Sequence, residues 1–233
     1  TYFNAKGEIL LKEALHPHLL HFARQFESKG SDQFEVKLTF DADKDEHLYG
    51  MGQYQNDCLD LKGTVLELAQ KNTQISIPFL LSSKGYGFLW NNPAIGRAEF
   101  SLTHTSFYAQ YTKQMDYVIF PGETPAKLVE HYADLTGKSP KMPEFATGYW
   151  QSKLRYYSQD DLLSVAREYK KRKLPISVIV ADFYHWPVTG DWKFNKQLWP
   201  DPKAMIKELD SLGIKLLVSV WPTLAQKSEN YNT

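Results

Sequence analysis

One apolar stretch that ends in a carboxylate constrains the fold of this chain more than any other feature. Residues 176–181 are almost wholly apolar, Asp182 follows them, and three of the next four residues are aromatic. A strand without a polar face is covered on both sides, which is typical of parallel sheets. Helix-like segments flank the stretch, so we expect an α/β arrangement with strands and helices in alternation.

The position of Asp182 also predicts a binding site. In parallel sheets and barrels the ligand binds at the carboxyl ends of the strands. A carboxylate there can accept hydrogen bonds from sugar hydroxyls, and aromatic rings can cover the apolar faces of a sugar ring. The stretch therefore indicates a carbohydrate site.

The second part of the chain has a β-α-β-α-β rhythm. Strands are predicted at three places: residues 147–152, 176–182 and 214–220. Ser158 begins one predicted helix, and Asp201 with Pro202 begins another that ends at Gly213. A loop of about eighteen residues separates the second strand from the second helix, and loops of that length are uncommon without a function.

This rhythm fits two architectures. Three strands could form an open sheet, or they could be the first part of a (β/α)8 barrel. Two helices on an open three-stranded sheet would leave one face of it mostly bare. We therefore expect a truncated TIM barrel over residues 141–233.

The first part of the chain, residues 1–140, has the period of β-structure. Apolar and polar residues alternate over residues 34–40, and short strand-like segments separated by turns follow it. The further predicted strands cover residues 64–68, 74–77, 86–90, 107–111 and 115–120. One helix is predicted from Pro125 to Leu135, capped by Thr124. Many short strands with turns predict an antiparallel β-sandwich, so the expected fold class is mixed.

Charge and composition exclude several classes of function. The 27 basic and 27 acidic side chains cancel, which argues against a nucleic-acid partner. The sequence has no run of 18 apolar residues that would predict a membrane span. Cys58 is the single cysteine, and the histidines have no metal-ligand spacing, so no disulfide, metal site or cofactor is predicted.

Several polar and aromatic residues are expected at the carboxyl rim of the three barrel strands. Alternation along the third strand places Ser219 and Trp221 on one face, one strand away from Asp182. Asp182 could instead cap a helix or pair with Lys153 or Arg155, and Trp221 could pack under the following loop. Asp191, in the long loop, is interpreted as a solvated turn residue. A glycosidase needs two carboxylates, and this rim offers one.

The order and spacing of several motifs resemble glycoside hydrolase family 31, the retaining α-glucosidase and α-xylosidase family. The resemblance covers nearly the whole chain. Its motifs are Tyr49-Gly50-Met51-Gly52-Gln53, Ile77-Pro78-Phe79, Trp90-Asn91-Asn92-Pro93, Phe120-Pro121-Gly122-Glu123-Thr124-Pro125, Gly148-Tyr149-Trp150-Gln151-Ser152, Asp182, Trp199-Pro200-Asp201-Pro202 and Leu212-Gly213-Ile214-Lys215.

The resemblance implies an N-terminal β-sandwich followed by a (β/α)8 barrel. It implies that Asp182 binds hydroxyls of the sugar in the −1 subsite, and that Phe183, Ser219 and Trp221 line the same pocket. Asn72 is the candidate for a sandwich loop that reaches this site, while Leu154 stands where many relatives have an aromatic residue. The resemblance implies no metal or organic cofactor, and it places both catalytic carboxylates outside residues 1–233.

The predicted function is therefore that of a fragment of a retaining, exo-acting α-glycosidase that hydrolyses terminal α-xylosyl or α-glucosyl residues of oligosaccharides. The chain begins at Thr1 without Met or a signal-like stretch, so we expect an internal piece of a longer protein. Because the resemblance places both catalytic carboxylates outside it, we expect this piece alone to be inactive. The alternative is a stand-alone carbohydrate-binding or structural module without catalysis. The open edge of the third strand makes a homo-oligomer possible.

Overall fold

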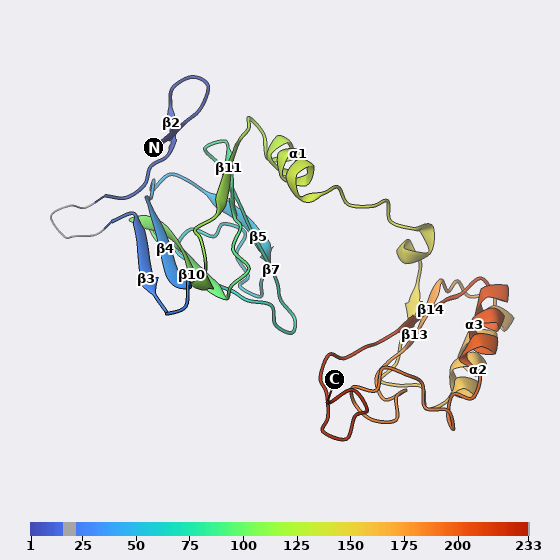
Figure 1. The fold of residues 1–233 in the computed structure, drawn as a ribbon. Coiled ribbons are helices and arrows are strands. Elements are labelled where there is room, and N and C mark those ends of the chain that lie inside the picture. Colours follow the sequence, from blue (N-terminus) through green and yellow to red (C-terminus); the bar gives the residue numbers. More distant parts are fainter. Residues whose placement is uncertain (16–21, 233) are drawn as a thin grey trace. The chain divides into compact units, whose positions relative to one another are not determined.

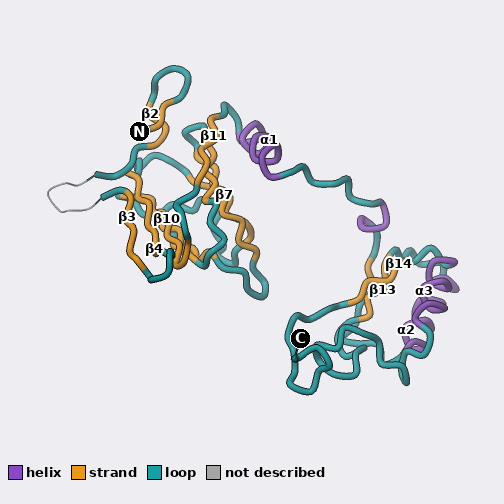
Figure 2. The backbone as a smooth tube through the Cα atoms, in the orientation of Figure 1, coloured by secondary structure: helices purple, strands orange, loops and turns teal. Residues whose placement is uncertain are grey.

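The chain forms two compact units, which are described separately. The computed structural model describes residues 1–15 and 22–232. The first unit is Thr1–Ser139 and the second is Pro140–Thr233. Figures 1 and 2 show that the first is built mainly of strands and that the second combines strands with two long helices.

The first unit contains two antiparallel sheets that face each other across a core. One sheet has the strand order β3-β4-β10-β9-β6 and the other has the order β11-β8-β7-β5, while β1 and β2 form a separate pair. The strands are β1 (Tyr2–Phe3), β2 (Ile9–Leu11), β3 (Arg24–Ser28), β4 (Phe34–Asp41), β5 (Leu48–Gln53), β6 (Val65–Leu68), β7 (Ile75–Ser82), β8 (Tyr86–Trp90), β9 (Gly96–Phe100), β10 (His104–Thr112) and β11 (Tyr117–Pro121).

The core between the two sheets explains why these segments form strands. Val36, Leu38 and Phe40 alternate along β4 with residues that are only partly buried, and all three are fully buried. Phe88 of β8 stacks on Phe107 of β10 with ring centroids 4.4 Å apart, so aromatic contact joins one sheet to the other. The predicted antiparallel sandwich is confirmed.

Helix α1 (Pro125–Thr136) covers part of the outer face of the four-stranded sheet. The Thr124 hydroxyl accepts a hydrogen bond from the Lys127 amide at the start of the helix, as the sequence predicts. Leu128 is the buried residue of α1, and it packs against outward-facing side chains of β7, β8 and β11, namely Phe79, Leu89 and Phe120. This cluster is separate from the core between the sheets.

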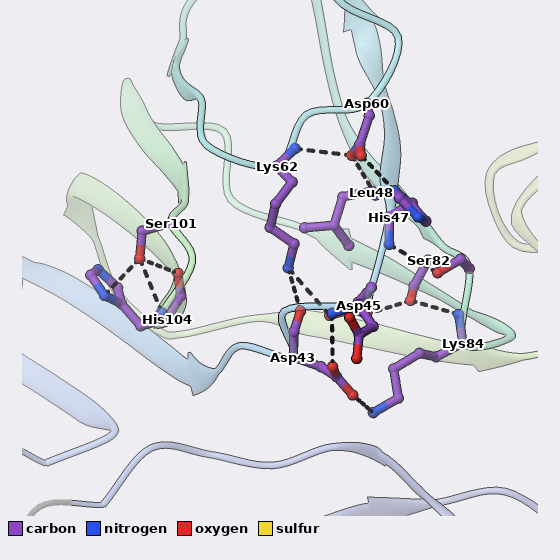
Figure 3. Close-up of polar contacts among 12 residues, drawn as sticks. Asp43, Asp45, His47, Leu48, Asp60, Lys62, Ser82, Lys84, Ser101 and His104 are labelled. Carbon is purple, nitrogen blue, oxygen red and sulfur yellow. Dashed lines mark hydrogen bonds and ion pairs between the residues drawn. The ribbon is translucent and has the colours of Figure 1, made fainter.

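A group of charged residues lies at one end of the sandwich, next to β5 (Figure 3). The Asp60 carboxylate contacts Nδ1 of His47 at 2.7 Å and accepts the backbone amides of Leu48 and Lys62, each at 3.0 Å. Burial acts to raise the pKa of Asp60, but these hydrogen bonds outweigh it and lower that pKa to about 2. The deprotonated carboxylate therefore holds this loop against the first residues of β5.

A buried carboxylate, Glu46, lies close to this group. Its Oε1 accepts hydrogen bonds from the hydroxyls of Ser82 and of Tyr86, the latter at 2.7 Å. Lys62 Nζ lies 3.8 Å from its Oε2, and both side chains are more than nine-tenths buried. Burial raises the pKa of the Tyr86 hydroxyl well above its ordinary value, so Tyr86 remains a donor to Glu46.

The second unit is a parallel three-stranded sheet with the order β12-β13-β14. Its elements are the 3-10 helix η2 (Glu144–Thr147), β12 (Trp150–Gln151), α2 (Gln159–Lys171), β13 (Val178–Ala181), α3 (Pro202–Ser211) and β14 (Lys215–Val218). The predicted β-α-β-α-β order is confirmed. Ser158 and Asp201 cap α2 and α3, as predicted.

Both long helices pack on the same face of this sheet. Ile179 and Ala181 of β13 belong to one buried cluster with apolar residues of α2 and α3. Arg167 of α2 donates two hydrogen bonds to Glu208 of α3, at 2.6 and 2.8 Å, so a bidentate ion pair joins the helices at the surface. On the opposite face, Leu217 of β14 is exposed.

The three parallel strands are shorter than the sequence predicts. The carbonyl of Tyr149 accepts the amides of both Ser177 and Val178, so regular pairing of β12 begins only at Trp150. At the other end of β13, the Asp182 side chain accepts the next backbone amide and ends the strand. Apolar composition predicts burial here, but these local hydrogen bonds set the ends of the strands.

Candidate active site

Asp182 lies at the carboxyl end of β13, beside the end of β14. The Ser219 amide donates to the Ala181 carbonyl at 3.0 Å, which extends the pairing of these strands by one residue. Oδ1 of Asp182 then accepts the Phe183 amide at 2.8 Å and the Ser219 hydroxyl at 3.2 Å. Among the described residues no hydrogen bond goes to Oδ2, so that oxygen is available to a ligand hydroxyl.

The two alternative interpretations of Asp182 are wrong. The helices that follow β12 and β13 are capped by Ser158 and Asp201, so Asp182 caps neither of them. Lys153 lies 3.3 Å from Asp161, and the guanidinium of Arg155 lies over aromatic rings. Both cations have other partners, and the Asp182 carboxylate is held by uncharged donors.

An aromatic wall, formed by Phe183, Tyr184 and Trp221, stands next to Asp182. The rings of Phe183 and Trp221 are stacked, with centroids 5.4 Å apart and an angle of 8° between their planes. Tyr184 lies on Phe183 at 4.4 Å. Three aromatic side chains from two loops thus form one apolar surface at the rim of the sheet.

The backbone of Tyr184 has an unusual conformation. Its φ of +64° is in the left-handed region, which non-glycine residues seldom adopt. Such strain at the end of a strand is frequent where a side chain must be aimed at a site. In this chain the strained residue, Tyr184, lies two positions after Asp182 and carries one ring of the aromatic wall.

A shallow pocket of about 610 Å³ borders the wall. Phe183 and Tyr184 form one side, and residues that follow β12 form the other, namely Lys153, Leu154, Arg155 and Tyr157. The guanidinium of Arg155 lies 4.5 Å from the ring centre of Tyr157 and 5.2 Å from that of Tyr184. Leu154 is strongly exposed at this pocket. In the family that the sequence resembles, an aromatic residue is common at this position.

His185 is a part of the site that the sequence analysis missed. Its side chain is buried, and its Nδ1 lies 3.1 Å from the Asp182 carbonyl. Burial lowers the pKa of His185, against a smaller opposing effect of Asp182, so the ring is neutral near pH 7 and Nδ1–H donates to that carbonyl. A histidine three residues after a strand-end aspartate is the signal for this turn.

Asp191 is buried, so its interpretation as a solvated turn residue is wrong. It is only 6% exposed, and its Oδ1 accepts the Glu229 amide at 3.0 Å. The partner is 38 positions away in the sequence. Local composition predicts a turn but carries no information on such a distant contact.

The structure therefore brings together Asp182, Phe183, Ser219 and Trp221, four of the five predicted site residues. Ser219 follows β14 directly and is still held by its backbone bond to Ala181, whereas Trp221 lies farther beyond the strand and is placed by the loop. Asn72 belongs to the first unit, where it lies exposed in a turn between Lys71 and Gln74. Its contribution to the site stays a prediction.

The described residues contain neither a metal-ligand cluster nor a membrane-spanning helix. No group of three or more His, Cys, Asp or Glu side chains in residues 1–15 and 22–232 could hold a metal ion. Within those same ranges, none of the helices combines the length and apolar character that crossing a membrane requires. Cys58 is an exposed free thiol.

Comparison with known proteins identifies both units. Residues 2–98 match the family model described as the glycosyl hydrolase 31 N-terminal galactose mutarotase-like domain. Residues 139–233 match the glycosyl hydrolases family 31 TIM-barrel domain. The second match confirms that the β-α-β-α-β unit is the start of a barrel and not an open sheet.

Individual relatives agree with the two models. An uncharacterized family 31 glucosidase of Pseudescherichia vulneris is 46% identical over 98% of this chain and 46% of its own length. An α-xylosidase of Saccharolobus solfataricus is 38% identical over 84% of this chain and 28% of its own length. The chain thus spans about half of the first relative and a smaller part of the second.

A solved structure extends the comparison to three dimensions. The family 31 α-xylosidase from a soil metagenome, complexed with xylose, superposes on 98% of this chain with a TM-score of 0.92 and 48% identity. The aligned part is 36% of that chain. From the two domain models, the relatives and this agreement in structure, we conclude that the chain belongs to glycoside hydrolase family 31.

Proposed function

We propose that the full-length protein is a retaining, exo-acting α-glycosidase that removes terminal α-xylosyl or α-glucosyl residues from oligosaccharides. Among the similar proteins named for xylose are the soil-metagenome α-xylosidase, 48% identical to the chain, and two α-xylosidases of Saccharolobus solfataricus and Aspergillus niger, each 38% identical. Those named for glucose are the glucosidase of Pseudescherichia vulneris, 46% identical but described as uncharacterized, and α-glucosidase 2 of Bacillus thermoamyloliquefaciens, 25% identical. Xylose is therefore the first substrate to test.

The arrangement around Asp182 carries the proposal. Oδ1 is occupied by Ser219 and by the Phe183 amide, while Oδ2 is available for a sugar hydroxyl. The aromatic wall lies beside it and can cover the apolar face of a pyranose. A fixed acceptor next to a flat apolar surface is what binding of a terminal sugar in the −1 subsite requires.

The roles of the individual residues follow from this placement. Asp182 binds sugar hydroxyls, Ser219 orients the Asp182 carboxylate, and Phe183 with Trp221 bounds the sugar. Asn72 is proposed as a further sugar contact on the family resemblance alone. The pocket beside Arg155 receives the next sugar unit of the oligosaccharide substrate.

Residues 1–233 contribute sugar binding and not bond cleavage. Retaining hydrolysis needs a nucleophile and an acid–base carboxylate about 5 Å apart. The rim described here offers Asp182 alone, whose two Oδ1 hydrogen bonds suit a binding role. The resemblance to the family places the nucleophile after the fourth barrel strand and the acid later, and requires no metal or cofactor.

Activity of the full-length protein tests the proposal. We expect release of 4-nitrophenol from the α-D-xyloside or the α-D-glucoside, with the α-anomer as the first product in an NMR time course. Release of neither, or formation of the β-anomer first, contradicts the proposal. Residues 1–233 alone should release no product.

A binding measurement on residues 1–233 tests the alternative of a stand-alone binding module. A module predicts that residues 1–233 fold cooperatively and bind xylose or glucose, which calorimetric titration would measure.

β14 is an edge strand of the described sheet, and such an edge could pair with a second copy. Sedimentation would detect a homo-oligomer of either the chain or the full-length protein.

A further inference from the structure

Two loops at the rim of the second unit are joined to each other over a long stretch. One connects β13 to α3 and covers residues 182–201, and the other follows β14 and covers residues 219–232. The Ala225 amide donates to the Thr189 carbonyl at 3.0 Å. Lys193 and Glu229 add an ion pair. Residues 182–201 are thus tied to the segment that carries Trp221. We call these two joined loops, residues 182–201 and 219–232, the clasp.

Asp191 is the buried centre of this clasp. Its carboxylate accepts the Glu229 amide at 3.0 Å, and its own amide donates to the Val188 carbonyl at 3.0 Å. A carboxylate that is 6% exposed is retained only where it has hydrogen-bond donors. Asp191 therefore ties the end of the 219–232 segment to the long loop.

Gly190 shows how closely the two loops approach. A Cβ at this position would lie 2.7 Å from the Leu224 side chain and 3.0 Å from its Cα. The φ of Gly190 is +98°, a conformation that side chains disfavour. Any other residue would separate the loops at the position next to Asp191.

Trp192 connects the clasp to the aromatic wall. Its indole Nε1 donates to the backbone carbonyl of Trp221 at 2.9 Å. The ring of Trp221, in turn, lies parallel to that of Phe183. One hydrogen bond thus fixes the backbone from which the outer ring of the wall projects.

We propose that Trp192 and Asp191 are positioning residues, which hold Trp221 in its stack on Phe183 and thereby set the affinity for the terminal sugar. This inference rests on the proposed function, which supplies the identity of the ligand as a terminal sugar. Trp192 and Asp191 need no contact with the sugar for this role. They act by keeping one face of its site in place before the sugar arrives, which reduces the ordering cost of binding.

Trp192→Phe in the full-length protein is the first test, because it removes the indole donor and retains an aromatic ring. We expect KM for the aryl α-xyloside to rise roughly two- to tenfold, the range of one neutral hydrogen bond, with kcat within about twofold of wild type. Partial unfolding would instead lower the apparent kcat and leave KM unchanged.

Trp150→Phe is the matched control. Trp150 is also a partly exposed tryptophan, and its Nε1 donates to the Ala146 carbonyl at 3.2 Å. The control removes the same kind of bond away from the wall, so KM should stay at the wild-type value. An equal rise of KM in both variants would overturn the inference.

A double-mutant cycle tests whether Trp192 acts through Trp221. In a Trp221→Ala background the wall has lost its outer ring, so adding Trp192→Phe should change KM no further. Independent, multiplying effects of the two substitutions would contradict the proposal.

Hydrogen exchange gives a readout that needs no activity. The Glu229 amide should exchange faster in Asp191→Ala than in wild type, and Asp191→Asn should restore protection because its amide oxygen still accepts the bond. Unchanged exchange in Asp191→Ala overturns the clasp. If wild type hydrolyses neither substrate, the proposed function fails, while the exchange result still decides the clasp.

Discussion

The hydroxyl of Ser219 donates to Oδ1 of Asp182 at 3.2 Å and so joins the ends of two adjacent parallel strands at the rim of the sheet. With the Phe183 amide on the same oxygen, the carboxylate is oriented before any ligand binds. The other oxygen of Asp182, Oδ2, is then in a fixed position from which it can accept a ligand hydroxyl.

Asp182→Asn in the full-length protein should lower kcat/KM for the proposed hydrolysis. In the proposed −1 subsite the carboxylate would make charge-assisted hydrogen bonds to sugar hydroxyls, and loss of one is worth roughly 1.5–3 kcal/mol, or about 10- to 150-fold. Steady-state kinetics on the aryl α-xyloside measure the loss. Asp201→Asn is the control, because Asn also caps α3 and should leave both activity and stability unchanged. Wild-type kcat/KM in Asp182→Asn would show that Asp182 has no role in sugar binding.

Asp60 should make the stability of the sandwich unit depend on pH in the acid range. Its pKa is about 2 in the folded chain and 3.8 ordinarily, so its contribution is complete above about pH 4 and is lost as pH falls toward 2. The side chain is 37% exposed, which limits the contribution to roughly 1 kcal/mol. Urea denaturation of wild type and Asp60→Asn at pH 7 and pH 3 should show a difference that shrinks at pH 3.

The exposed Asp57 offers a control for this prediction. Asp57→Asn should leave the denaturation midpoint close to wild type at both pH values. If the difference in denaturation midpoint between wild type and Asp60→Asn is larger at pH 3 than at pH 7, the assigned role of Asp60 is refuted.

Glu46→Ala should destabilise the sandwich strongly. It removes the acceptor of the buried Tyr86 hydroxyl and leaves the buried Lys62 ammonium without its counter-ion, which typically costs about 3–5 kcal/mol. Glu46→Gln keeps an acceptor oxygen and should lose less. Denaturation midpoints that rank Glu46→Gln at or below Glu46→Ala would contradict the importance of the Tyr86 and Ser82 hydrogen bonds.

Gly52→Ala should also destabilise the sandwich, at the bulge where β5 pairs with β7. The new Cβ would lie 2.2 Å from the Ile75 carbonyl oxygen, at a φ of +102°. Gly63→Ala shares the left-handed backbone, with a φ of +86°, but its Cβ meets nothing within 4 Å. Gly63→Ala should cost roughly 1 kcal/mol and Gly52→Ala at least about twice that in denaturation experiments. Equal costs would show that the contact with β7 relaxes.

The sequence predicts the three capped helices and six of the eleven described sandwich strands because their signals are local, whereas it does not predict β1, β2, β3, β5 and β9. Thr124, Ser158 and Asp201 all cap the helices expected of them, since a cap depends on a side chain and an amide within three residues. The alternation in β4 likewise predicts which side chains are buried. The rim position of Asp182 follows from the apolar strand before it.

What escaped prediction depends on contacts between distant residues. The burial of Asp191 is decided by Glu229, and the position of Trp221 by Phe183 and Trp192. The order in which the sandwich strands pair is another example, because β4 lies between β3 and β10. No window of neighbouring residues contains this information.

The strand order of the two units carries a consequence for the time course of folding. In the second unit each strand pairs with the next one along the chain, whereas in the first unit β4 pairs both with its neighbour β3 and with the distant β10. Loops that close over short separations close faster. We therefore expect amides of β13 to gain protection before the amides that join β4 to β10, but after those that join β4 to β3, in pulse-labelled refolding, although β4 is synthesised first. The nascent chain would then carry an unfinished sandwich while the barrel strands are already pairing.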